Sequence, residues 1–249
     1  MKVIDTHRHI WQKDCWSESI KRAIAETIAK KKLPFKDPDA LLPHMGEKGS
    51  DPDGNLMIKD MDEQDVDVSI LHHVDWGMAF KDDAPVSIEE LNKRHCELAK
   101  KYPGRVYSLF AIDPRRPGGV KLFEKAVKEW GAIGLNFYPP WGFYPDDPIC
   151  YPFYQKAIEL GVPVSIHTGF QHWPGLHNKY ARPIYLDDVG CHFPKRLHDF
   201  LVEGIVGILG NESVVGMKSG EAQFFREVGG ALEVIDSLAA ILARHHTDR

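Results

Sequence analysis

The chain has 249 residues, 43% of them hydrophobic, which is enough for one sizeable core and a normal size for one domain. Its formal net charge of -5 comes from 31 basic and 36 acidic residues without a long run of one sign, so neither nucleic acid nor a membrane surface is an expected partner. No apolar run approaches the ~18 residues that a membrane span requires, and the amino terminus lacks the apolar stretch of an export signal.

Strand-like and helix-like segments alternate along the chain, which is the pattern of β/α units around a parallel sheet. An insertion over 13–56 holds an amphipathic helix at 17–32 and then a loop rich in proline and glycine. The helix expected over 87–101 opens on Ser87, which forms a Ser-x-x-Glu capping box with Glu90. The other expected helices are 57–64, 118–130 and 150–160, and the expected strands are 2–9, 66–72, 105–112, 132–137 and a fifth that closes at His167.

The end of the first strand carries two histidines, His7 and His9, two positions apart. Residues i and i+2 of a strand point to the same face, so the two imidazoles can be presented side by side to one ion. The carboxyl ends of barrel strands are where α/β barrels place their chemistry. The pattern therefore favours a metal site over a pair of surface histidines.

A third histidine, His167, closes the fifth predicted strand, in which Val164 and Ile166 share one face. A lone histidine at a strand end is more often structural than a ligand. Together with His7 and His9, however, it completes the three protein ligands that a catalytic zinc site uses beside its water. We therefore predict that these three histidines hold one divalent ion, with zinc as the expected metal.

These residues also carry a family resemblance. The chain resembles the amidohydrolase-related family (amidohydrolase 2) of the metal-dependent amidohydrolase superfamily from residue 1 to about residue 195. The resemblance implies a TIM-type (β/α)8 barrel with one divalent ion, and the family includes hydrolases and non-oxidative decarboxylases of aromatic or enol-type carboxylates. The segments that carry it are Asp5-Thr6-His7-Arg8-His9, the stretch 61–67, Asp113-Pro114-Arg115-Arg116, and the stretch 138–169 with Ile166-His167-Thr168-Gly169.

The fourth expected strand bears on the number of metal ions. Many barrels of the superfamily carry a lysine there that bridges two ions, but the inward position in this chain is Asn136. An amide cannot make that bridge, so a mononuclear site is expected. Asn136 either orients substrate or is a hydrogen-bonded amide of the barrel interior.

Aromatic residues gather in the loop after this strand, which includes Tyr138 and Trp141. With Trp11 opposite them, these rings would suit a flat or aromatic substrate, or they simply roof the core. His72, at the end of the second strand, is a further candidate for contact with substrate because alternation turns one of His72 and His73 inward. The predicted substrate-binding residues are thus Trp11, His72, Asn136, Tyr138 and Trp141.

The sequence departs from the family pattern after about residue 195. The family places an acid–base histidine and a strand-8 aspartate there, but no histidine lies between His198 and His245, and Asp236 is the one aspartate between Asp199 and Asp248. Strand-like runs at 204–209 and 213–217 leave an eighth strand hard to find. The barrel is thus expected to be shortened or incomplete at its C-terminal end, or the tail is divergent or rearranged; the acid–base residues stay unassigned.

The sequence thus predicts a single domain, 1–249, that acts on a small-molecule substrate. Metal-dependent hydrolysis by an activated water is the expected reaction, with non-oxidative decarboxylation or an inactive metal-binding remnant as alternatives. A barrel that lacks a closing strand exposes backbone edges, so association into a homo-oligomer is also expected.

The four cysteines are Cys15, Cys96, Cys150 and Cys191, which form no C-x-x-C pair, so we expect a reducing, cytoplasmic compartment.

Overall fold

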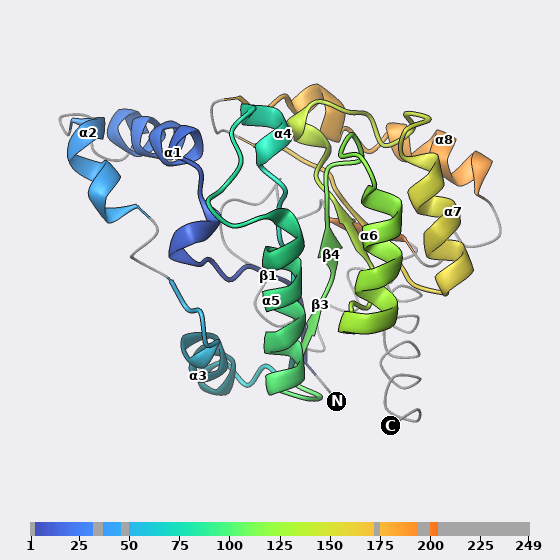
Figure 1. The fold of residues 1–249 in the computed structure, drawn as a ribbon, viewed down its shortest axis with the longest axis horizontal. Helices are drawn as coiled ribbons and strands as arrows, with labels where there is room; N and C mark the ends of the chain where they lie inside the picture. Colours follow the sequence, from blue (N-terminus) through green and yellow to red (C-terminus); the bar gives the residue numbers. More distant parts are fainter. Residues whose placement is uncertain (1–2, 32–36, 46–49, 172–174, 194–199, 204–249) are drawn as a thin grey trace.

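The computed structural model describes residues 3–31, 37–45, 50–171, 175–193 and 200–203. Within them the chain folds into parallel strands with helices packed outside (Figure 1). The first sheet has the order β1 (Ile4–Arg8), β2 (Val68–Leu71), β3 (Val106–Ser108). The second has the order β4 (Phe110–Ala111), β5 (Leu135–Phe137), β6 (Val164–His167), β7 (Phe200–Glu203).

The two sheets are joined through Leu109, which lies between β3 and β4. Its backbone N–H donates to the carbonyl of Leu71 on β2, whereas the N–H of Phe110 donates to Gly134 on the way into β5. The single strand expected over 105–112 therefore pairs with β2 along its first half and with β5 along its second. The strands follow one another in chain order, as β/α units do when they build a barrel wall.

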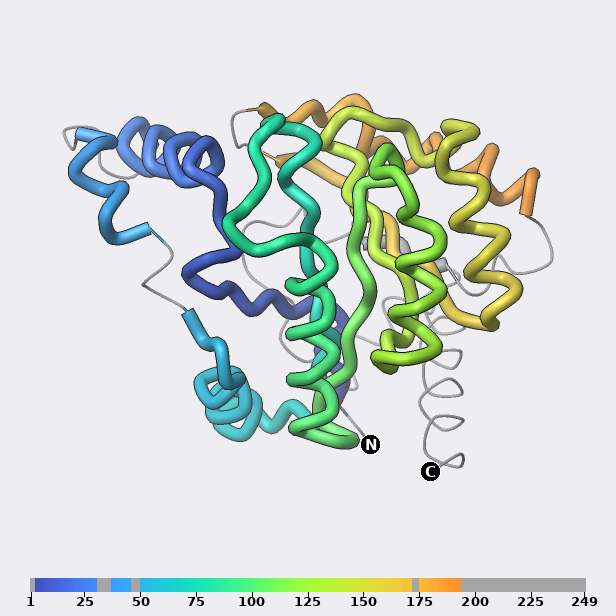
Figure 2. Tube along the Cα trace, in the orientation of Figure 1, coloured from blue at the N-terminus to red at the C-terminus, as the bar shows by residue number. Residues whose placement is uncertain are grey.

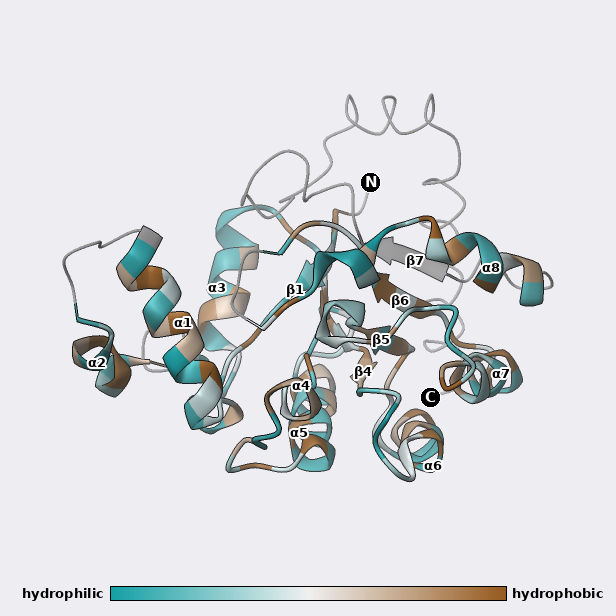
Figure 3. Cartoon of the chain, turned by 90° about the horizontal axis from the view of Figure 1, so that it is seen from above, coloured by the Kyte–Doolittle hydropathy of each residue, from teal (hydrophilic) through white to brown (hydrophobic). Residues whose placement is uncertain are grey.

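The helices that follow these strands cover the outside of the sheet. Figure 3 shows α5 (Ile88–Lys101), α6 (Gly119–Lys125) and α7 (Tyr151–Leu160) on one side of the strands. Ser87 caps α5, because its hydroxyl accepts from the N–H of Glu90 at 3.2 Å as the capping box predicts. The main core lies between these helices and β4, β5 and β6, and its largest fully buried side chains include Phe110, Phe123, Phe137 and Tyr154.

The insertion forms a separate group of helices beside the strands (Figure 2). Its main helix, α1 (Glu18–Lys31), matches the helix expected at 17–32. The stretch 33–55, expected to be loop, contains α2 (Pro38–Leu41), the 3-10 turn η2 (Leu42–His44) and the first residue of α3 (Asn55–Glu63). Proline at the first turn of a helix loses no backbone hydrogen bond, so Pro38 begins α2 where a loop was predicted.

Several short elements were not expected from the sequence. The helix predicted at 118–130 ends as α6 and continues as a π-helical turn, η3 (Ala126–Trp130). The remaining unexpected elements are short, and their sequences show no long periodic pattern. They are η1 (Lys13–Cys15), α4 (Gly77–Phe80), η4 (Pro139–Trp141), η5 (Asn178–Ala181), α8 (Tyr185–His192) and β7.

The α/β architecture of the prediction is confirmed, and closure into an eight-stranded barrel stays a prediction. Across the residues given above, β1 and β7 stand at the two ends of the row of strands and do not pair with each other. The strand-like runs 204–209 and 213–217 and the expected atypical tail lie outside the described residues, apart from 200–203. In the same part of the chain, no helix is long and apolar enough to cross a membrane.

Candidate metal centre and aromatic wall

His7 and His9 meet at the carboxyl end of β1, as their spacing predicted. Their Nε2 atoms lie 2.8 Å apart, with the ring planes at 76°. Two nitrogens bonded at ~2.1 Å to one ion lie about 3.0 to 3.4 Å apart, so a metal needs only a few tenths of an ångström of opening. The pair therefore fits two positions in the coordination shell of a divalent ion.

The backbone of β2 fixes the orientation of His9. Its Nδ1–H donates to the carbonyl of His72 at 2.9 Å, which leaves the Nε2 lone pair directed at His7. A ligand histidine whose other nitrogen donates to a carbonyl is the usual arrangement around protein-bound metals, because that bond fixes the tautomer. The residues present thus have the donor chemistry that the predicted ion requires.

His72 itself stands behind the pair. Its ring stacks on that of His7 with centroids 4.7 Å apart and planes 11° from parallel, and its Nε2–H donates to the carbonyl of Thr6 at 2.8 Å. The side chain is 1% exposed. This placement gives His72 a supporting role against His7, and contact with substrate stays a prediction.

His167 ends β6, which lies in the second sheet, whereas β1 lies in the first. Its Nε2 accepts from the amide of Gln171 at 3.2 Å, so this nitrogen carries a lone pair as a ligand must. In the part of the chain that the structure describes, no group of three or more His, Cys, Asp or Glu side chains lies close enough to hold a metal ion. The structure therefore assembles two of the three predicted ligands, and the third stays a prediction.

Aromatic rings connect the two halves of this site. Trp11 stacks on His9 with centroids 5.0 Å apart, and Tyr138 lies 4.5 Å from His167. We refer to Trp11, Trp76, Trp141 and Tyr138 as the aromatic wall, whose successive ring centroids lie 5.7, 5.2 and 5.6 Å apart in that order. Each predicted metal ligand at the ends of the wall thus has an aromatic neighbour.

The wall is only partly open. Trp11 and Tyr138 are half-buried, whereas Trp76 and Trp141 are buried and pack in a cluster with Ile20 of α1 and other apolar side chains. The interpretation that the rings roof the core holds for Trp141, and contact of the loop with substrate stays a prediction. Trp141 roofs the core, and Tyr138 stands beside His167.

Asn136 lies on β5 between the two histidine groups. Its amide donates to the carbonyl of His73 at 2.8 Å, and the side chain is 2% exposed. The amide nitrogen is thus hydrogen-bonded in the interior, while the buried Oδ1 has no hydrogen-bond partner among the described residues, and a role in substrate orientation stays a prediction. The residue also lines a narrow crevice at the ends of β2, β4 and β5 that has no room for a water molecule, together with residues that include Asp75, Asp113 and Tyr138.

Two buried aspartates at this edge were not singled out from the sequence. Asp75 pairs with Arg116 through two bonds of 2.5 and 2.7 Å, and Asp113 pairs with Arg115 through bonds of 2.8 and 2.6 Å. The signal was present in Asp113-Pro114-Arg115-Arg116, which follows a strand end. Asp75 could not be found from the sequence, because it meets Asp113 only through a contact between two loops, and the two residues are 38 positions apart.

His73 and His95 form a second histidine pair, on the side of β2 that faces α5. Their ring centroids lie 5.0 Å apart, and burial lowers the pKa of both, that of His95 to about 4. Both therefore stay neutral at physiological pH. Their position within the layer between sheet and helix makes them core residues.

Comparison with known proteins identifies the family of the chain. The family model described as amidohydrolase matches residues 4–198. The chain belongs to the amidohydrolase family. Members of this family are enzymes, and they typically use a divalent metal.

One curated relative is 2-keto-4-carboxy-3-hexenedioate hydratase from a Sphingobium species, 35% identical over 72 residues. The match covers 26% of this chain and 21% of the hydratase. Two solved structures are similar in fold. They are 2,6-dihydroxybenzoate decarboxylase from Rhizobium, at 14% identity and TM-score 0.54, and 5-carboxyvanillate decarboxylase from Novosphingobium aromaticivorans with bound manganese, at 16% and 0.51.

The matches to the two decarboxylases cover 82% of this chain and 66% and 65% of theirs. The chain thus spans slightly less than two thirds of the length of these decarboxylases and about one fifth of the hydratase. At these identities the solved structures establish likeness of fold alone. The manganese in one of them leaves zinc as a prediction for this chain.

Proposed function

We propose that this amidohydrolase-family chain is a metal-dependent enzyme that acts on a small planar carboxylate, and that it releases carbon dioxide from it. The observation that carries the proposal is the stacking of Trp11 on His9 at 5.0 Å. It makes an aromatic surface continuous with the atoms that would bind the ion. A flat ring held against Trp11 would bring its carboxylate to the His7–His9 edge.

The residues of the chain would divide the work as follows. His7 and His9 would hold the ion, with His167 as the third ligand, and the carbonyl of His72 would keep His9 in the ligand tautomer. When bound, the metal would orient a carboxylate and a neighbouring oxygen of the substrate. Tyr138, beside His167, would hold the opposite edge of the substrate ring.

Hydrolysis, the reaction expected from the sequence, is the second candidate. It is favoured by the His7–His9 pair, because this pair and His167 would supply three imidazoles. Three imidazoles and one open position are the ligand set of ions that activate water. The hydratase relative belongs with this candidate because hydration also uses a water. The two reactions share the metal site and differ in the group that leaves the substrate.

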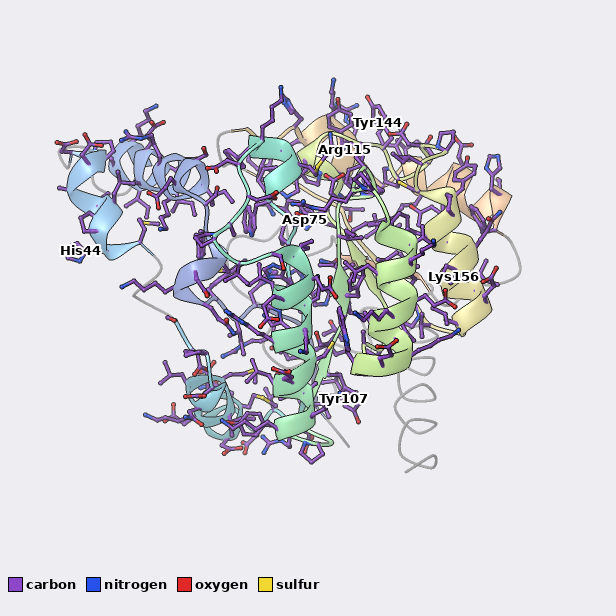
Figure 4. The ribbon with its side chains drawn as sticks, in the orientation of Figure 1. His44, Asp75, Tyr107, Arg115, Tyr144 and Lys156 are labelled. Atoms are coloured by element: carbon purple, nitrogen blue, oxygen red, sulfur yellow. The ribbon has the colours of Figure 1, made fainter. Side chains whose placement is uncertain are left out.

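The test uses the full chain supplied with zinc or with manganese. A panel of hydroxybenzoates, lactones and acyl thioesters is assayed for released carbon dioxide, for released acid and for hydrated product. We expect carbon dioxide from a hydroxybenzoate and a loss of at least about a hundredfold in kcat/KM for His9→Ala. His44→Ala, on the exposed turn η2 of the insertion, is the matched control and should keep its activity (Figure 4). If acid is released without carbon dioxide, the reaction is hydrolysis and not decarboxylation. If no compound is turned over, both candidate reactions are refuted.

A further inference from the structure

Two adjacent arginines tie together the loops that follow β2, β4 and β5. Arg116, in the loop after β4, donates to the carboxylate of Asp75 from Nε and from one terminal nitrogen. The same terminal nitrogen also pairs with Asp83. Asp75 and Asp83 lie at either side of α4, the short helix after β2. A single guanidinium therefore binds residues on both sides of α4, of which Asp75 is buried and Asp83 is 65% exposed.

Arg115 makes the corresponding connection to the loop after β5. It pairs with Asp113 through two nitrogens and donates to the carbonyl of Trp141 at 3.1 Å. The two halves are joined, because the backbone N–H of Asp113 donates to Asp75 at 2.9 Å. We refer to Asp75, Asp113, Arg115 and Arg116 as the arginine clamp; Figure 4 labels Asp75 and Arg115 in the upper part of the molecule, near α4.

The clamp is largely shielded from water. The side chains of Asp75 and Asp113 are 3% and 1% exposed, and those of Arg116 and Arg115 are 19% and 31% exposed. Paired carboxylates as buried as these hold a fixed geometry, because every departure leaves a charge without a partner in a medium of low polarity. Surface ion pairs give no such constraint.

The α4 loop approaches the side chains of Asp83 and Arg116 closely at Gly77. A Cβ built on Gly77 would lie 1.8 Å from Oδ1 of Asp83 and 2.5 Å from a terminal nitrogen of Arg116. Any side chain there would push Asp83 away from the guanidinium. The turn is therefore shaped to fit the ion pair.

The segments that the clamp holds carry the buried half of the aromatic wall. Trp76 immediately follows Asp75, and Trp141 supplies the carbonyl that Arg115 binds. The rings of these two tryptophans are the link between Trp11, beside His9, and Tyr138, beside His167. The distance between the two ends of the wall thus depends on loops whose positions the arginines fix.

From this geometry we propose that Arg115 and Arg116 are positioning residues for substrate specificity: they hold Trp76 and Trp141 so that the wall spans from the His7–His9 pair to His167. The proposal rests on the proposed function for the substrate, a planar carboxylate. It predicts that loosening the clamp weakens binding of a flat substrate and leaves the metal in place. In this role neither arginine would contact the substrate.

The test compares Arg116→Gln with Arg105→Gln in the full, metal-supplied chain. Arg105 is a matched control because it also pairs with a carboxylate, Asp62 at 2.7 Å, but it precedes β3 at the opposite end of the sheet. We expect Arg116→Gln to raise KM for the best hydroxybenzoate about tenfold or more, with kcat within about threefold and metal content unchanged. Arg116→Lys, which keeps the charge, should recover part of the loss.

Near-ultraviolet circular dichroism supplies a readout that does not depend on turnover. The contacts among Trp11, Trp76 and Trp141 should give the native chain a strong tryptophan signal, which Arg116→Gln should reduce by about half and Arg105→Gln should leave intact. If Arg116→Gln does not fold, Asp75→Asn tests the same point, since it removes the buried charge that Arg116 binds and leaves no carboxylate without a partner. Asp75→Asn should then reduce the tryptophan signal relative to the native chain.

The two proposals can fail separately. A native chain without turnover refutes the proposed function, while the tryptophan signal and the binding of 2-hydroxybenzoate by fluorescence quenching still test the clamp. An unchanged tryptophan signal in Arg116→Gln, together with an unchanged KM or dissociation constant, overturns the positioning role. Equal losses in Arg105→Gln overturn it as well, because they would report a general loss of stability.

Discussion

Arg115 and Asp113 should not be equivalent in their contributions to stability, although they form one ion pair. The carboxylate of Asp113 is 1% exposed, whereas the guanidinium of Arg115 is 31% exposed. Arg115→Met leaves a buried carboxylate that has lost two strong donors and that water does not reach. Asp113→Asn leaves an arginine that can turn toward solvent, and the amide still accepts from the backbone N–H of Arg115, at 3.0 Å in the native chain.

The magnitudes follow from this difference in burial. Breaking a buried ion pair from the side that leaves a charge behind costs about 3–5 kcal/mol, so Arg115→Met should lower the free energy of unfolding by that amount. Asp113→Asn loses one charge-assisted pair but strands no buried charge, and should cost about 1–2 kcal/mol. For a chain of this size, the first change corresponds to a melting temperature lower by roughly 6–20 °C.

The assay is urea unfolding at neutral pH, followed by the tryptophan signal and by far-ultraviolet circular dichroism. The double variant Arg115→Met with Asp113→Asn completes a thermodynamic cycle, and it should be more stable than Arg115→Met alone because the buried charge is then gone. Equal losses for the two single variants, or a double variant that loses the sum of both, would show that burial of the carboxylate does not control this pair.

Three further results are expected. Purified protein should contain about one divalent ion per chain by metal analysis. His167→Ala should lose most of this metal, whereas His198→Ala, at a position outside the described residues, should keep it. Equal metal loss in the two variants would show that the predicted site is wrong. One thiol, Cys191, should react quickly with a disulfide reagent near pH 8, because burial raises the pKa of the other three cysteines, and Cys191→Ser should abolish the fast phase. Burial lowers the pKa of His95 from 6.5 to about 4, so the unfolded chain binds more protons between these values and stability falls as pH drops through them, by about 3 kcal/mol in all. His95→Asn should flatten this acid limb in urea unfolding, and an unchanged slope would assign the acid limb to other groups.

Residues close in sequence were the part of the site that could be predicted. The separation of two positions between His7 and His9 determines that they share a face of β1, because strand geometry repeats every two residues. Their Nε2 atoms do meet, at 2.8 Å. The helices with strong patterns were predicted for the same reason, and Ser87 caps α5 as its capping box indicated.

Contacts between separate loops could not be predicted in this way. Nothing in the sequence near Asp75 indicates that Arg116, 41 residues later, binds it, and nothing near Trp76 places it between Trp11 and Trp141. Such partners are selected by the order and stagger of the strands, which a local pattern does not encode. The short turn α4 was missed because four residues are too few to show a helical period.

The sequence by itself determined the alternation of strands and helices, the pairing of His7 with His9, and the family, because each depends on short-range periodicity or on a contiguous motif. Only the tertiary structure decided that the single strand expected over 105–112 serves two sheets, that His72 supports His7, and that two arginines hold the tryptophans between the histidine groups. The physical reason is that buried charges and stacked rings acquire their partners only when strands distant in sequence are brought to one edge of the sheet.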